Sequence, residues 1–134
     1  VISWEKYLEW LPKVKALDNE PKQFQELRSD TMVLISKPRI IESEYRFICV
    51  DGKVITGSMY KSGITPMQLE CKDQTIIDFT QKMIDMWVPD RAFAIDIAIS
   101  DGNCYVLEMG CMNAAGLYHC DVQKIVMAIE NMKF

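Results

Sequence analysis

Two acidic residues, Asp96 and Glu108, stand in apolar segments on either side of Asp101-Gly102. The alternation in residues 92–100 predicts a strand in which Asp96 shares one face with alanines, while phenylalanine and isoleucine occupy the other face. A carboxylate in such a strand is expensive to bury unless a metal ion, a cation or a hydrogen-bond network is its partner. The small neighbours leave space for a ligand, so these two carboxylates are the first candidates for chemistry.

The turn between the two strands decides whether both carboxylates lie on one face. With a two-residue turn at Asp101-Gly102, regular pairing places Asp96 opposite Leu107 and turns Glu108 to the other face. A three-residue turn that also includes Ser100 places Asp96 diagonally from Glu108 on the same face. We therefore predict an odd-membered turn; a strict two-residue turn without a bulge would exclude a shared metal.

Two basic residues are candidates for binding an anion. Arg46 lies near the start of a predicted strand, and its planar guanidinium suits phosphate oxygens; Lys61, at the end of the next strand, would be a second cation. Surface exposure is the commoner explanation for such residues, and a structural ion pair is the alternative explanation for Asp96. Spacing alone leaves both alternatives open.

Asn113 is a candidate neutral ligand in the irregular segment that follows Glu108. Its amide oxygen suits a hard cation, and magnesium accepts carboxylate, amide and phosphate oxygens together. The small residues beside Asn113 are typical of a loop around a ligand, and equally of a turn between a strand and a helix.

The elements that must position these residues predict an α+β fold with a mostly antiparallel sheet of two hairpins and a short strand, packed by helices. Asp-Gly pairs flanked by apolar and β-branched residues mark the hairpins. A loop with Gly63 and Pro66 follows the first hairpin. The expected strands are residues 31–36, 40–50, 53–60, 92–100 and 103–110.

Helices are expected over residues 3–17, after the cap residue Asp73 and after Asp121. The second helix would bury a stripe that ends at Trp87, before Pro89. The third would bury Val122, Ile125, Val126 and Ile129. We expect one domain over residues 1–134, with a helical lead-in over 1–30 and a functional part over 31–134, and the start at Val1 suggests a fragment of a longer protein.

The composition excludes some classes of function. The formal net charge is −4 and no cluster of lysine and arginine occurs, which argues against a dedicated nucleic-acid surface. We find no apolar run of membrane-spanning length and no signal peptide. Five cysteines without a secretory signal indicate reduced thiols, so we expect a cytoplasmic protein.

The order of the segments resembles the C-terminal part of an ATP-grasp domain. That superfamily includes glutathione synthetase, ribosomal S6 modification ligases and D-alanine ligase. The similarity runs from about Met32 to the end of the chain. The segments that carry it are residues 32–36, 44–52, 94–98 and 106–110.

The resemblance implies a role for each candidate. The backbone of Ile35-Ser36-Lys37 would contact adenine, Arg46 and Lys61 would contact ATP phosphates, and Asp96 and Glu108 would hold Mg²⁺. It implies an ATP- and magnesium-dependent ligase that activates an unknown carboxylate as an acyl phosphate, which an amine or thiol then attacks.

Two features depart from the family pattern. Glycine stands at position 110, where the family usually has asparagine, and Asn113 is the candidate substitute. The N-terminal subdomain with its lysine-bearing strand is not recognisable in this sequence. A degenerate ATP-grasp module that binds a nucleotide or a protein without catalysis is therefore the alternative. A purely structural module, in which the carboxylates only pair with Arg46 or Lys61, is a third.

Overall fold

A computed structural model of the chain describes residues 9, 12–13, 16 and 38–132. The chain divides into two compact units, residues 1–39 and 40–134. In the first, the described residues Glu9, Pro12, Lys13 and Ala16 are helical; the predicted strand over 31–36 and most of the predicted first helix lie outside the described residues. None of the described helices is long and apolar enough to cross a membrane.

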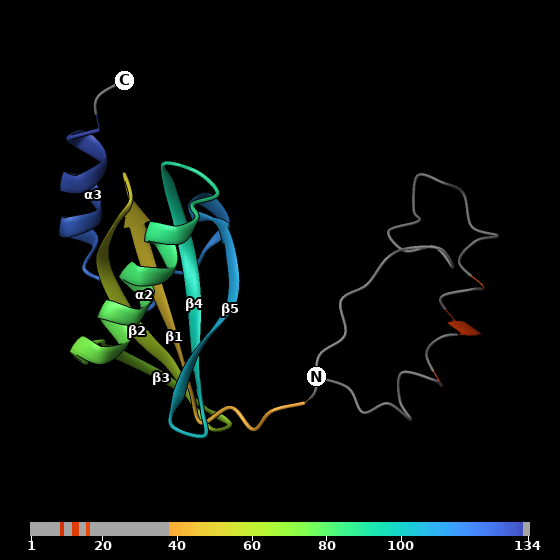
Figure 1. The fold of residues 1–134 in the computed structure, drawn as a ribbon. Helices are drawn as coiled ribbons and strands as arrows, with labels where there is room; N and C mark the ends of the chain where they lie inside the picture. Colours follow the sequence, from red (N-terminus) through yellow and green to blue (C-terminus); the bar gives the residue numbers. More distant parts are fainter. Residues whose placement is uncertain (1–8, 10–11, 14–15, 17–37, 133–134) are drawn as a thin grey trace. The chain divides into compact units, whose positions relative to one another are not determined.

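The second unit contains a five-stranded antiparallel sheet in the order β3-β2-β1-β4-β5 (Figure 1). The predicted α+β class is confirmed. Because β1 and β4 pair in the centre, the two predicted hairpins become one continuous surface. The strands are β1 (Ser43–Val50), β2 (Lys53–Ser62), β3 (Thr65–Glu70), β4 (Ala92–Ser100) and β5 (Asn103–Cys111).

The prediction of an odd-membered turn before β5 is wrong. Ser100 pairs with Asn103, and the two-residue turn between them has positive φ at both positions, 49° and 69°. An Asp-Gly pair adopts this conformation readily because both residues tolerate positive φ. A β-bulge restores the shared face instead: Ile97 pairs with Val106 but Asp96 pairs with Glu108, so Leu107 is the extra residue.

Strand β3 corrects a second prediction, that of a loop around Gly63 and Pro66. The chain turns at Gly63, where φ is +55°, and then pairs with β2. Proline lacks the backbone N–H that a central strand needs, but an edge strand tolerates it. Strand β3 is such an edge, so Pro66 does not prevent pairing.

Helix α2 (Gln74–Met86) covers one face of the sheet, where Phe47, Phe93, Ile95 and Ile97 form the core with it (Figure 1). The predicted cap is confirmed, because the Asp73 side chain accepts a hydrogen bond from the backbone N–H of Thr75. Trp87 is not part of the buried stripe: it follows the helix and is 61% exposed.

Helix α3 (Val122–Glu130) packs on the opposite face, against Ile48 and Ala94. Asp121 is its N-cap. Ile125 is buried and Ile129 is partly buried, as predicted, whereas Val122 and Val126 are exposed. The face of the sheet beside α3 is therefore only partly covered, and it is the face that carries Arg46 and Asp96.

Candidate functional site

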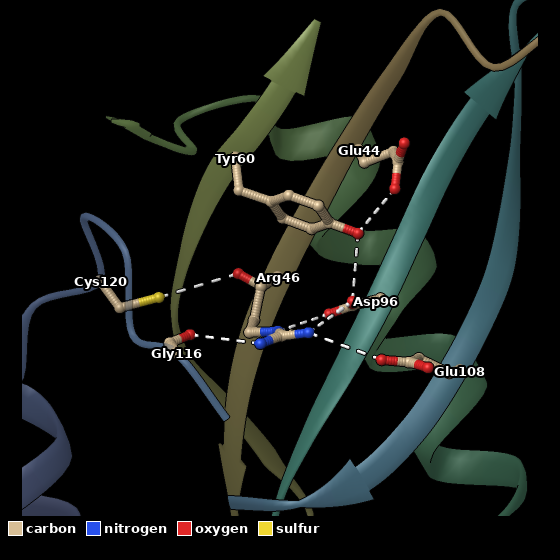
Figure 2. Close-up of polar contacts among 7 residues, drawn as sticks. All are labelled: Glu44, Arg46, Tyr60, Asp96, Glu108, Gly116 and Cys120. Atoms are coloured by element: carbon tan, nitrogen blue, oxygen red, sulfur yellow. Dashed lines mark hydrogen bonds and ion pairs between the residues drawn. The ribbon is translucent and has the colours of Figure 1, made fainter. Parts of the chain in front are cut away.

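The centre of the site is a bidentate ion pair between Arg46 on β1 and Asp96 on β4 (Figure 2). The two residues are direct cross-strand partners. Arg46 Nε donates to Asp96 Oδ1 at 2.8 Å, and Arg46 Nη2 donates to Oδ2 at 2.7 Å. Asp96 is only 4% exposed, so the pair supplies the partner that its burial requires. This hydrogen bond raises the pKa of the Arg46 guanidinium, against the opposing effect of burial.

Glu108 lies beside this pair on the edge strand β5. The bulge at Leu107 places it directly opposite Asp96, and its Oε1 is 3.5 Å from Arg46 Nη2. The Glu108 side chain is 70% exposed, so this contact is weak and leaves the carboxylate available. A cavity of about 180 Å³ is lined by Arg46, Asp96 and Glu108 together with small residues, Ala94, Gly110, Ala114 and Ala115, and by Cys111.

A second bulge, in β2, brings Tyr60 to the same site. Glu44 pairs with Lys61 but Tyr45 pairs with Met59, so Tyr60 is the extra residue. As a result Tyr60 and Lys61 both reach Glu44: the phenol donates to Oε2 at 2.8 Å, and Lys61 Nζ lies 2.5 Å from Oε1.

The Tyr60 hydroxyl also lies 3.1 Å from Asp96 Oδ2 (Figure 2). A phenol carries a single proton, so it donates to one of the two carboxylates at a time. Burial, followed by its hydrogen bond to Glu44, raises the pKa of Tyr60. Tyr60 therefore stays protonated at neutral pH and links the Lys61–Glu44 pair to the Arg46–Asp96 pair.

The loop before α3 closes over Arg46 from the other side. Tyr118 stacks on Tyr60 with ring centroids 4.8 Å apart, and the Arg46 guanidinium lies 5.6 Å and 5.3 Å from the centroids of Tyr60 and Tyr118. Arg46 Nη1 also donates to the carbonyl of Gly116 at 3.4 Å. Backbone N–H groups of His119 and Asp121 tie this loop to hydroxyls on β2, those of Ser58 and Thr56.

Three of the predicted site residues come together: Arg46, Asp96 and Glu108. Lys61 does not line their cavity and is paired with Glu44. Asn113 lines a neighbouring cavity of about 460 Å³, which shares only Gly110 and Cys111 with the first.

The predicted adenine hinge, Ile35-Ser36-Lys37, lies outside the described residues. Sequence reasoning missed Tyr60 and Tyr118. The only signal for Tyr60 was its position next to Lys61, since a bulge cannot be located from strand alternation alone.

The two carboxylates fit a magnesium ion in donor type. Asp96 and Glu108 lie side by side on one cavity, and magnesium commonly uses one or two carboxylates and takes its other ligands from water and substrate phosphates. Among the described residues no group of three or more His, Cys, Asp or Glu side chains is arranged to hold a metal. A carboxylate offers about four acceptor positions, and Asp96 already has three donors around it, two from Arg46 and one from Tyr60.

Replacing Tyr60 with phenylalanine is expected to lower the free energy of unfolding by about 1–2 kcal/mol, since a part-buried hydrogen bond to charged groups is lost. Urea unfolding measures the change. Tyr118→Phe is the matched control, because it keeps the stacked ring and its hydroxyl takes no part in the two carboxylate contacts. Equal losses in the two variants would contradict a role for the Tyr60 hydroxyl.

Comparison with known proteins agrees with this arrangement. A family model described as an ATP-grasp domain, the second family of its clade, matches residues 12–128. A solved structure, that of C-terminally truncated Cdc123 from Schizosaccharomyces pombe, is similar to 96% of this chain, with a TM-score of 0.50 and 15% sequence identity. The chain spans 54% of that structure, and this likeness concerns the fold alone. No curated protein matches the sequence. Because the family model covers most of its length, the chain belongs to the ATP-grasp superfamily.

Proposed function

We propose that this chain is part of an ATP- and magnesium-dependent ligase that joins a carboxylate to an amine or a thiol. The observation that carries the proposal is the direct opposition of Asp96 and Glu108 across one cavity, with Arg46 at its wall. A nucleotide-binding role follows from the family, and the ligase chemistry is the finer step that we infer here.

In such a ligase the γ-phosphoryl group of ATP passes to the substrate carboxylate, ADP leaves, and the amine or thiol then displaces phosphate. Asp96 and Glu108 would hold Mg²⁺, which would neutralise negative charge on the phosphates. Arg46 would contribute a fixed cation beside the transferred group, in a site where part of the water is excluded.

The remaining assignments stay predictions. Lys61 would reach phosphate only after separating from Glu44, and Asn113 would act from the neighbouring cavity. The backbone of Ile35-Ser36-Lys37 would bind adenine. We infer that an N-terminal ATP-grasp subdomain closes over the nucleotide and that the protein acts in the cytoplasm.

Calorimetric titration of the full-length protein with a non-hydrolysable ATP analogue and Mg²⁺ tests the proposal. Wild type is expected to bind, whereas Asp96→Asn and Glu108→Gln are each expected to weaken binding by about tenfold or more, since each removes a metal ligand. Glu70→Gln is a matched control on the far edge strand, where Glu70 pairs with Lys72. Absence of both heat and thermal stabilisation with wild type would contradict the proposal.

A second candidate is nucleotide or protein binding without catalysis. Two observations favour it: Arg46 occupies both oxygens of Asp96, and position 110 carries no side chain where the family usually has asparagine. The two candidates differ in turnover. Analogue binding together with the absence of ATP hydrolysis or ADP release, across carboxylate and amine substrates, would favour this second candidate.

A further inference from the structure

The Arg46 guanidinium stands where a divalent cation would have to bind Asp96. Its Nε and Nη2 atoms take one oxygen each, at 2.8 Å and 2.7 Å, and the Tyr60 hydroxyl is the third donor. One acceptor position of the carboxylate then remains. A metal ion that binds Asp96 strongly must therefore displace at least one of the two Arg46 hydrogen bonds.

Arg46 has other contacts that do not involve Asp96. Its guanidinium lies over the rings of Tyr60 and Tyr118, and its Nη1 donates to the carbonyl of Gly116. These contacts are neutral, so they keep the cation in place without replacing the lost negative charge. Separation from Asp96 would leave a cation that is 13% exposed without an anionic partner of good geometry.

An anionic phosphate entering the same cavity would provide that partner. Arg46 lines the cavity together with both carboxylates, and a guanidinium binds phosphate oxygens as readily as it binds a carboxylate. Metal and phosphate therefore each supply what the other one's arrival removes.

We propose that a magnesium–nucleotide complex binds here by an exchange of partners, in which Mg²⁺ replaces Arg46 at Asp96 and a phosphate replaces Asp96 at Arg46. This inference rests on the proposed function and adds a rule for binding at that site. Mg²⁺ alone binds poorly, because it must break the ion pair without compensation. The affinities for Mg²⁺ and nucleotide are then positively coupled, by the 5- to 150-fold, roughly, that is typical of coupled sites.

Titration of the full-length protein with Mg²⁺ alone, without nucleotide, tests the exchange. Arg46→Met is expected to bind Mg²⁺ about tenfold or more tightly than wild type, because Asp96 then has no competing cation. Adding Asp96→Asn to this variant is expected to abolish the gain. The matched control is Arg91→Met, which breaks another bidentate arginine–aspartate pair, that with Asp51 on the surface, and is expected to bind Mg²⁺ as wild type does.

Arg46→Lys provides a second variant in case Arg46→Met does not fold. An ammonium group is a point charge without the planar fork, so it does not reproduce the bidentate contact, and the gain in Mg²⁺ affinity is expected to be intermediate. Equal Mg²⁺ affinity in wild type and in both Arg46 variants would overturn the exchange. So would a metal that binds through Glu108 alone, because Arg46 substitutions would then leave its affinity unchanged.

The outcomes separate this inference from the proposed function. If wild type binds the ATP analogue with Mg²⁺ but the Arg46 variants show no gain for Mg²⁺ alone, the exchange is wrong and the proposed function stands. If wild type does not bind the analogue but Arg46→Met gains Mg²⁺ affinity through Asp96, competition at Asp96 is supported and the proposed function is wrong.

Discussion

Arg46→Met is expected to lower the free energy of unfolding by about 3–5 kcal/mol in the absence of metal, because it leaves a buried aspartate without its counter-ion. Asp96 is 4% exposed, and both of its oxygens bond to the guanidinium. The Tyr60 hydroxyl remains as a donor but carries no charge. Urea unfolding of wild type and variant measures the loss.

A double substitution separates loss of charge balance from loss of packing. Arg46→Met combined with Asp96→Leu replaces the ion pair by apolar side chains, a change that is often close to neutral, so most of the stability is expected to return. Arg91→Met breaks the surface pair with Asp51 and is expected to change stability little. An Arg46→Met variant as stable as wild type would contradict the view that the pair neutralises Asp96.

Gly57→Ala is expected to lower the free energy of unfolding by about 1–3 kcal/mol, as overpacking of a core does. Gly57 on β2 pairs with Phe47 on β1, and a Cβ at this glycine would overlap the Phe47 ring. Phe47 is fully buried under α2, so its ring has little room to move. The change therefore tests the cross-strand register on which the neighbouring Arg46 depends.

Gly110→Ala is the matched control for Gly57→Ala. No heavy atom lies within 4 Å of a Cβ built at Gly110, so the methyl group meets open space. Alanine also restricts the unfolded chain, so the variant is expected to be unchanged or more stable by up to about 1 kcal/mol. Thermal unfolding of the two variants gives the comparison, and equal losses would contradict the register between β1 and β2.

Local sequence signals predicted the two hairpins and the helix starts well. Asp51-Gly52 and Asp101-Gly102 both form two-residue turns with positive φ, because this dipeptide favours that conformation without help from distant residues. Asp73 and Asp121 cap the helices where predicted, since a cap also depends only on its neighbours.

The long-range features were harder to predict. Alternation alone does not locate the extra residues Tyr60 and Leu107, because a bulge depends on the register of two strands at once. The pairing of β1 with β4 joins residues 50 positions apart and creates the Arg46–Asp96 contact, which short-range spacing does not encode. The sequence therefore supplied the chemical groups of the site, and the register of the sheet selected which of them meet.

The central claim is that Asp96 and Glu108 form a magnesium–nucleotide site guarded by Arg46. A crystal structure of the full-length protein with Mg²⁺ and a non-hydrolysable ATP analogue tests it most directly. We predict that Mg²⁺ is bonded to carboxylate oxygens of both Asp96 and Glu108, with a phosphate oxygen in contact with Arg46. Nucleotide and metal bound elsewhere, with the bidentate Arg46–Asp96 pair intact, would contradict the claim.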